Sequence, residues 1–480
     1  MRLYTEKQYQ AGIRAAVQAT EAQIQVCIEA ATAPLLQRIA ELEEKIARLE
    51  KNSSNSSKPP SSDIVKPPKG TGKNLKGKKK RKRGGQHGHP RHERKAFSPE
   101  EVTVRHPEFT LDLDPAEWEA LDQWETHHQL ELKETPLDVH EYRARLYRNR
   151  LTGEIISAAI PSHILAGGIA GPRLSAFIGF LKGRCHTSYT TIETLTDEVF
   201  GQRLCRGTLA KIVTSRVSPA LVPVYDELLA LLPSEPYLGI DETGHKDNGD
   251  KFWTWCFRAP EYTLFRIDET RSTEVLRQVL GSAFAGVISC DYYSAYLCFM
   301  KESSAVMQFC LAHLIRDVKF LAESGDKVTR NWAMKILNLF RKLFRLIHRK
   351  DELTEAHFQR TLITLRDQLI KKFRAAPQRQ GPQNLRDRFK VNPQKFFTFI
   401  TTPGVQPTNN FTEQAIRYLI IDRRITQGTR GRKGRKWCER IWTTISTCEA
   451  QGRSTFQFLC DAVTAHFNGL APPSLITAGP

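Results

Sequence analysis

Apolar residues near the start of the chain recur at the spacing of a helix. Alternating steps of four and three residues separate Leu35, Ile39, Leu42, Ile46 and Leu49, as in the a and d positions of a coiled coil. We expect residues 1–52 to be helical, with a helix start at Pro34, because proline is tolerated in a first helical turn. Two interpretations remain open: a coiled coil that pairs two chains, or an amphipathic helix packed on its own domain.

From residue 237 the pattern changes to short apolar runs that are bounded by turn residues, which is typical of strands. Three strands are predicted first, over residues 237–240, 252–257 and 262–267. A helix over 272–280, a strand ending at Asp291 and a fifth run over 305–309 follow. This order is typical of the ribonuclease-H-like fold, in which the first and fourth strands are adjacent. We therefore predict an α/β fold with a mixed five-stranded sheet.

The remaining segments differ in composition and period. We predict a disordered Ser/Pro-rich and basic linker over 53–96, a small α+β domain over 97–165, a helical region over 166–234, the α/β domain over 235–450 with a helical insertion at about 317–400, and a C-terminal helix and tail over 451–480. Within the helical region, residues 191–213 match a helix-turn-helix with Gly201 near the turn. Paired short helices also occur in domains that do not bind DNA, so both interpretations remain open.

Charge narrows the class of partner. The chain has 71 Lys and Arg against 52 Asp and Glu, a formal net charge of +19. Basic proteins bind phosphate backbones through counterion release, which makes nucleic acid the leading partner; the alternative is a basic surface that binds nothing. The densest tract in the linker consists of Lys78, Lys79, Lys80, Arg81, Lys82 and Arg83. Such a tract contributes affinity for DNA without sequence specificity.

Cysteine usage and hydropathy indicate an intracellular protein. Ten cysteines are scattered without a regular framework, as expected for reduced thiols. No apolar run approaches the length of a membrane span, and the N-terminus has no apolar signal core.

Two carboxylates follow two of the predicted strands. Asp241 lies after the first strand, before a turn predicted at Gly244, and Asp291 ends the fourth. If these strands are adjacent, the two acids lie side by side, as a divalent-metal site requires. Glu242 is a weaker candidate than Asp241, because alternation places it on the opposite side of the strand.

A third acid, Glu413, lies in the first turn of a helix that Asn409 or Asn410 is predicted to cap. Two interpretations are equally compatible with the spacing: Glu413 is a third metal ligand, or it completes a capping box with Asn410. Arg417, four residues later, is expected either to pair with Glu413 or to contact a DNA phosphate.

A succession of motifs resembles bacterial transposases of the DDE type, specifically the insertion-sequence-66 family. The motifs are Asn55-Ser-Ser-Lys-Pro-Pro-Ser-Ser-Asp63, Asp241-Glu-Thr-Gly244, Cys290-Asp291-Tyr-Tyr-Ser-Ala-Tyr296, Cys310-Leu-Ala-His313 and Asn409-Asn410-Phe-Thr-Glu413-Gln-Ala-Ile-Arg417. The resemblance implies a catalytic and metal-binding triad of Asp241, Asp291 and Glu413 on a ribonuclease-H-like core, with Mg²⁺ or Mn²⁺ as cofactor. It also implies double-stranded DNA as substrate at transposon ends and targets, a homodimer or higher oligomer in the bacterial cytoplasm, and accessory proteins of the element as further partners.

One departure from the family concerns zinc. Family members resemble one another in a cysteine-based zinc module after the basic linker, but this chain has no cysteine between Cys27 and Cys185. The absence argues against zinc at that position. Cys310 and His313 have the spacing of half a zinc site, and two ligands do not complete one. We expect Cys310 to be structural and His313 to be an accessory residue near the metals or a phosphate.

A basic segment with interspersed glycines follows Glu413. It consists of Arg423, Arg424, Arg430, Arg432, Lys433, Arg435 and Lys436. We expect a flexible segment that lines the groove for DNA; a merely solvated face is the alternative.

The implied reaction is cleavage of a phosphodiester at a transposon end, followed by attack of the freed 3′ hydroxyl on target DNA. Two rival functions remain, an inactive transposase-derived DNA-binding protein and a ribonuclease-H-like nuclease without strand transfer.

Overall fold

The computed structural model describes residues 6–49, 98–100, 102, 114, 130, 132–133 and 136–476. The predicted linker, including Lys78, Lys79, Lys80, Arg81, Lys82 and Arg83, lies outside these residues. So do most residues of the predicted small domain before residue 136, including the greater part of its predicted helices.

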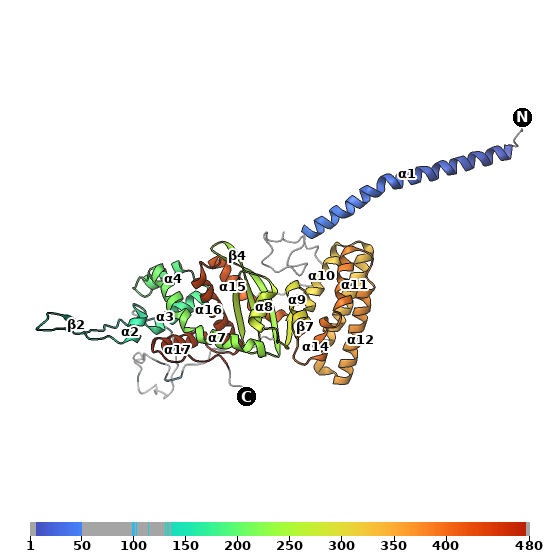
Figure 1. Ribbon diagram of the computed structural model, residues 1–480. Coiled ribbons are helices and arrows are strands. Elements are labelled where there is room, and N and C mark those ends of the chain that lie inside the picture. The colour runs from blue at the N-terminus through green and yellow to red at the C-terminus, as the bar shows by residue number, and fades with distance from the viewer. Residues whose placement is uncertain are drawn as a thin grey trace.

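Helix α1 (Glu6–Leu49) forms the N-terminal segment. The predicted helix start at Pro34 is wrong, because α1 continues through this proline. The alanines before Pro34 favour a helix, and this offsets part of the cost of the backbone hydrogen bond that a proline removes. Leu35 and Ile39 are 65% and 51% exposed, so these two side chains do not pack on their own domain. Figure 1 shows α1 extending away from the sheet.

A hairpin and a group of helices precede the sheet. Strands β1 (Leu146–Arg148) and β2 (Ile155–Ser157) pair antiparallel within the predicted small α+β domain. The helices are α2 (Ser162–Gly167), α3 (Pro172–Gly183), α4 (Tyr189–Glu198), α5 (Arg206–Ile212), α6 (Ser218–Ala220) and α7 (Val222–Leu231). A π-helical turn, Val213–Val217, joins α5 to α6. Pro172 occupies the first turn of α3, as its fixed φ favours.

The five predicted strands form one mixed sheet. They are β3 (Tyr237–Asp247), β4 (Asp250–Arg258), β5 (Thr263–Asp268), β6 (Val287–Cys290) and β7 (Val306–Phe309), in the spatial order β5-β4-β3-β6-β7. β3 pairs antiparallel with β4 and parallel with β6, so the first and fourth strands are adjacent as predicted. Helix α8 (Thr273–Leu280) lies between β5 and β6 in sequence, and α9 (Ser294–Glu302) lies between β6 and β7.

The first strand is longer than predicted. β3 continues seven residues beyond Ile240, and the predicted turn at Gly244 is wrong. The strand continues because β4 pairs with it as far as Asp247, opposite Asp250. The chain turns instead at Asn248 and Gly249, whose φ values of 52° and 97° suit a two-residue hairpin. Asp241 therefore lies within β3, at the level where β6 ends.

A group of helices follows the fifth strand, over the stretch where a helical insertion is predicted. It comprises α10 (Leu311–Ser324), α11 (Lys327–Ile347), α12 (Glu355–Arg374), α13 (Gln380–Val391) and the short α14 (Thr398–Thr401). Its aromatic core joins the sheet: Phe389 stacks on Phe373 and Phe396, with ring centroids 3.9 and 4.6 Å apart. Figure 1 shows this bundle beside the β7 side of the sheet.

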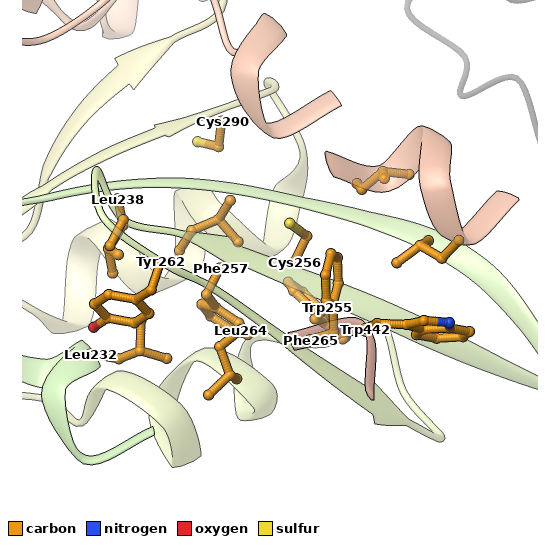
Figure 2. Packing of buried hydrophobic residues seen from close by; sticks show 14 of the residues in the cluster. Leu232, Leu238, Trp255, Cys256, Phe257, Tyr262, Leu264, Phe265, Cys290 and Trp442 are labelled. Carbon is orange, nitrogen blue, oxygen red and sulfur yellow. The ribbon is translucent and has the colours of Figure 1, made fainter. Parts of the chain in front are cut away.

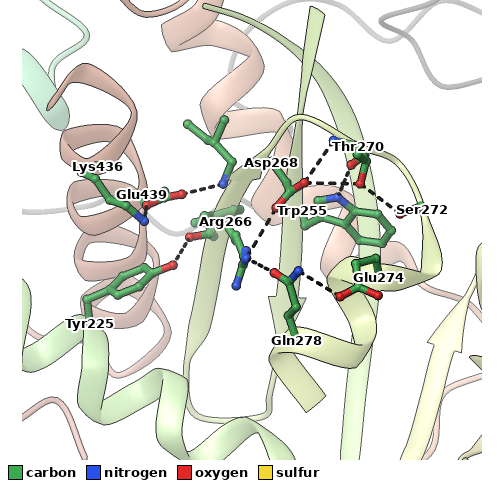
Figure 3. A network of polar contacts seen from close by, with 12 residues as sticks. Tyr225, Trp255, Arg266, Asp268, Thr270, Ser272, Glu274, Gln278, Lys436 and Glu439 are labelled. Carbon is green, nitrogen blue, oxygen red and sulfur yellow. Dashed lines mark hydrogen bonds and ion pairs between the residues drawn. The ribbon is translucent and has the colours of Figure 1, made fainter. Parts of the chain in front are cut away.

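The last three helices complete the fold: α15 (Asn410–Thr426), α16 (Arg432–Ala450) and α17 (Thr455–Phe467). Side chains of α16 accept hydrogen bonds from the outer N–H groups of the edge strand β5. Glu439 accepts from Ile267 at 2.8 Å, Thr443 from Phe265 at 3.0 Å, and Thr447 from Thr263 at 3.2 Å (Figure 3 shows Glu439). The spacing of four along the helix thus blocks this sheet edge from pairing further.

Large aromatic residues pack on both faces of the sheet: the ring of Phe265 packs edge-on against Trp442 of α16, with centroids 6.3 Å apart, whereas Trp255 and Phe257 lie on the opposite face. Figure 2 shows Trp255, Phe257, Phe265 and Trp442 in one buried cluster, and all four are at most 2% exposed. This core fixes α16, and with it the position of α15. None of the described helices is long and apolar enough to cross a membrane.

Candidate active site

The register of the sheet brings Asp241 and Asp291 together. β3 pairs with β6 from Tyr237 opposite Val287 to Gly239 opposite Ser289, a constant offset of 50 residues. Asp241 and Asp291 differ by the same 50 residues, and each lies two positions after the last pair. Both residues are partly buried. The pair of carboxylates is therefore a direct consequence of strand register.

Backbone hydrogen bonds orient the two carboxylates. Asp241 Oδ1 accepts the N–H of Glu242 at 2.9 Å, and Asp291 Oδ1 accepts the N–H of Tyr293 at 3.1 Å. Burial raises the pKa of Asp241 well above its usual range, and the charges of Glu242, Asp291 and Glu413 raise it further. Burial, then the charge of Glu242, raises the pKa of Asp291 to about 7, while Arg271 acts in the opposite direction. Crowded carboxylates of this kind are stabilised by a cation.

The N-terminus of α15 delivers Glu413 to the same place. Asn409 precedes the helix, and its Nδ2 donates to the carbonyl oxygen of Ile240, next to Asp241, at 2.9 Å. Gly239 permits this approach, because a Cβ at that position would lie 2.1 Å from Thr412 Oγ1. Glu413 lies in the first turn of α15, as predicted.

Glu413 binds an arginine rather than capping its helix. Nη2 of Arg316, from α10, donates to Oε1 and Oε2 of Glu413 at 3.1 and 3.3 Å. Within the described part of the chain, no capping hydrogen bond of Glu413 is present, and its ion pair is with Arg316 rather than Arg417. Arg417 is exposed. The capping-box interpretation is therefore not supported.

Cys310 and His313 lie beside Glu413. Cys310 precedes α10, and its Sγ accepts the N–H of Asn409 at 3.1 Å. His313 Nδ1 is 3.7 Å from Glu413 Oε1. Burial, together with the charge of Arg316, lowers the pKa of His313 to about 4, so the imidazole is neutral at physiological pH.

Glu242 lies in a buried network next to the two aspartates, close enough for its charge to raise the pKa of both. Its side chain is inaccessible to solvent and forms an ion pair with Arg271, whose Nε lies 2.6 Å from Oε1. The hydroxyl of Tyr296 also donates to this carboxylate. Sequence alternation predicted that Glu242 points away from the triad, but it did not identify Arg271 or Tyr296. The sequence gives little sign of the pairing between Arg271 and Glu242, because Arg271 lies in a loop 29 residues away.

The three acids have the ligand chemistry that a hard divalent cation prefers. Asp241, Asp291 and Glu413 offer carboxylate oxygens, which Mg²⁺ and Mn²⁺ prefer. Burial is the main cause of the raised pKa of Asp241, and the charges of Glu242, Asp291 and Glu413 add to it, so a cation at this position would relieve the repulsion between these carboxylates. Arg316 contributes the positive charge that holds Glu413 in this arrangement.

The basic segment after Glu413 is not a flexible loop. Arg423 and Arg424 lie in the last turn of α15, and the first turns of α16 contain Arg432, Lys433, Arg435 and Lys436. The short connection between them binds the β3–β4 hairpin, since Thr429 and Asp247 form a parallel bridge. This bridge and the two helices fix the backbone, so the expectation of flexibility is wrong.

The cations of this segment divide into two groups. Arg435 forms an ion pair with Asp247, and Lys436 forms one with Glu439 at 2.8 Å, so both cations contribute to contacts within the chain. Arg423 donates to Thr243 at 3.3 Å. The exposed members are Arg424, Arg430, Arg432 and Lys433. These four remain candidates for contact with DNA.

The predicted helix pair is present between residues 189 and 212. α4 and α5 are separated by a turn in which Gly201 has a φ of 65°. Arg206 begins the second helix, as the sequence indicated.

Comparisons with known proteins place the chain in a family. The model of the family described as "Transposase IS66 family" matches residues 167–436, more than half of the chain. Residues 8–95 match a model described as "Family of unknown function (DUF6444)". A protein of Sinorhizobium fredii (strain NBRC 101917 / NGR234), described as "Uncharacterized protein y4jD", is 30% identical over 217 residues, which are 40% of this chain and 40% of that protein. The chain thus matches less than half the length of this relative.

Proposed function

Since the chain belongs to the insertion-sequence-66 family of transposases, we propose that it cleaves DNA at the ends of a mobile element and joins the freed 3′ hydroxyl to target DNA. The observation that carries the proposal is the convergence of Asp241, Asp291 and Glu413. Strand register aligns the two aspartates, and the charge of Glu413 is close enough to raise the pKa of Asp241.

The fold supports the same proposal. A sheet in the order β5-β4-β3-β6-β7, with only β4 antiparallel to its neighbours, agrees with the ribonuclease-H-like architecture expected from the sequence. We therefore assign residues 235–450 to a ribonuclease-H-like catalytic domain, with α10 to α14 as its helical insertion. The exposed Leu35 and Ile39 of α1 favour pairing of two chains through this helix.

In this mechanism, the fold holds the three carboxylates in fixed positions. Mg²⁺ or Mn²⁺ held by Asp241, Asp291 and Glu413 would stabilise charge on the attacking and leaving oxygens of an in-line displacement. Asp241 is fixed within a paired strand, and the contacts of Asn409 with Ile240 fix the start of the helix that carries Glu413. Arg271 opposes the rise in the pKa of Asp291 and so favours its ionised form.

Arg316 has a defined part in this site. Its guanidinium spans both oxygens of Glu413 and restricts the carboxylate to one orientation. We propose that the same positive charge also attracts a phosphate of bound DNA. Exposed Arg424, Arg430, Arg432 and Lys433 extend the positive surface from α15 to α16, and favour the phosphate backbone without reading sequence.

The test is cleavage of labelled duplexes that carry the element ends, with Mg²⁺ or with a chelator. We expect Mg²⁺-dependent nicks that free 3′ hydroxyls, followed by products joined to a target plasmid, and neither product with Asp241→Asn. Metal-dependent nicking that survives in Asp241→Asn would refute the assignment of this acid. Cutting without joining would identify a nuclease, and binding without cutting would identify an inactive relative.

A further inference from the structure

Three metal-binding side chains of different chemistry meet where β7 ends and α10 and α15 begin. The ligand atoms of Cys310, His313 and Glu413 all lie within 4.8 Å of one another. His313 Nδ1 and Glu413 Oε1 are 3.7 Å apart. Ligand bonds of about 2.0–2.2 Å place a nitrogen and an oxygen ligand of a tetrahedral ion roughly 3.3–3.5 Å apart, so this pair needs only a small movement to reach the required separation.

The imidazole of His313 has an unused ligand atom. Its side chain is only 13% exposed, and its buried Nδ1 has no hydrogen-bond partner among the residues that the structure describes. Buried polar atoms are rarely left in this state, because they have lost water without gaining a partner. A cation between His313 and Glu413 would satisfy this nitrogen.

We infer that Cys310, His313 and Glu413 form a binding site for a thiophilic divalent ion of the Zn²⁺ class. Thiolate and imidazole ligands select such ions, whereas Mg²⁺ prefers the oxygen ligands of Asp241 and Asp291. Cys310 binds as the thiolate, so its thiol proton is released to solvent. The spacing of Cys310 and His313 supplies two ligands, and the fold adds the third from a helix about a hundred residues later.

The residues around the proposed site leave room for a fourth ligand and orient two of the three side-chain ligands. A cavity of about 40 Å³ is lined by both Cys310 and His313, and it has room for the water that would complete a four-coordinate ion. Arg316 would keep its hydrogen bond to Oε2 of Glu413 while Oε1 binds the ion. Hydrogen bonds of this kind commonly orient metal-bound carboxylates. The N–H of Asn409 likewise donates to the sulfur of Cys310.

The site shares Glu413 with the proposed catalytic centre but uses different partners. A Zn²⁺-class ion bound there would link Glu413 of α15 to His313 of α10. Its binding requires neither DNA nor catalysis, so it stands or falls separately from the proposed transposition reaction.

Cobalt absorption tests this inference directly. Purified full-length protein, first stripped with a chelator, is titrated with Co²⁺, which gives a thiolate-to-metal charge-transfer band when a cysteine binds it. We expect the band to saturate at one Co²⁺ per chain, to vanish on addition of Zn²⁺, and to persist in excess Mg²⁺. Cys310→Ser should abolish the band and still fold, because serine keeps an acceptor for the N–H of Asn409.

The matched control is Cys298→Ser. Cys298 is exposed and also contacts a carboxylate, Glu302, at 3.1 Å, but it has no part in the proposed site. This variant should keep the band, whereas His313→Gln should lower the affinity for Co²⁺ at least tenfold with an unchanged circular dichroism spectrum. Absence of the band in the wild type, or its survival in Cys310→Ser, would overturn the inference. Either result would leave the cleavage assay unaffected.

Discussion

Gly239→Ala should disable the candidate active site without altering any of its acids. The added Cβ would lie 2.1 Å from Thr412 Oγ1, 2.4 Å from Phe411 Cζ and 2.8 Å from Asn409 Oδ1. All three atoms belong to the start of α15, which carries Glu413. Since real Cβ atoms do not approach so closely, α15 must move away from β3.

Two costs determine how much Gly239→Ala lowers the free energy of unfolding. Forcing a methyl group into a packed site costs about 1–3 kcal/mol. If the shift also breaks the buried hydrogen bond from Asn409 to Ile240, a further 1–3 kcal/mol is lost. We expect destabilisation of about 2–6 kcal/mol in urea unfolding. Displacement of Glu413 by about 1 Å should lower the cleavage rate on the order of 100-fold.

Gly244→Ala is the matched control in the same strand. No atom of the described chain lies within 4 Å of a Cβ built at Gly244, and its backbone is ordinary strand. Alanine there should leave the cleavage rate unchanged and add up to about 1 kcal/mol of stability. If Gly239→Ala matches Gly244→Ala in both stability and cleavage, the close approach of α15 to β3 is wrong.

Two further predictions concern buried charges. Arg271→Ala leaves the carboxylate of Glu242 buried without its cation, and should destabilise the protein by about 3 kcal/mol in urea unfolding. The double variant Arg271→Ala/Glu242→Gln should recover part of this stability. If it recovers none, the ion pair between Arg271 and Glu242 is contradicted. Burial, then Arg423, lowers the pKa of His245 from 6.5 to about 4, so the unfolded state binds this proton more readily and stability should fall as the pH drops from about 6.5 towards 4. His245→Gln should remove about 2 kcal/mol of the destabilisation between pH 7 and pH 5, and identical pH profiles for wild type and variant would refute the shift.

Strand order and the positions of the acids could be predicted from the sequence because they depend on local patterns. Short apolar runs identified all five strands, and the adjacency of β3 and β6 placed Asp241 beside Asp291. The length of β3 was missed because Gly244 was interpreted as a turn. Asn248 and Gly249, a strong hairpin signal, identify the actual turn.

The partners of the acids could not be predicted because they depend on packing between distant segments. Arg316 and Glu413 are 97 residues apart, and only the docking of α10 against α15 brings them together. In the basic segment, composition did not distinguish Arg435, which pairs with Asp247, from Arg432, which is exposed. Charge density predicts a partner class, whereas the use of each cation depends on what lies opposite it.

We propose that Asp241, Asp291 and Glu413 act as one metal-dependent unit. The most direct test is single-turnover cleavage of a labelled element end in Mg²⁺ by Asp241→Asn, Asp291→Asn, Glu413→Gln and the Asp241/Asp291 double variant. Glu274→Gln, at an exposed acid on α8, is the control.

We predict that each triad variant binds the DNA but cleaves it on the order of 100-fold or more slowly. The double variant should be little slower than either single variant, because the rate losses from substituting residues that act as a unit do not add. The control should cleave at the wild-type rate. Cleavage within tenfold of wild type in any triad variant, or losses that multiply in the double variant, would contradict the account.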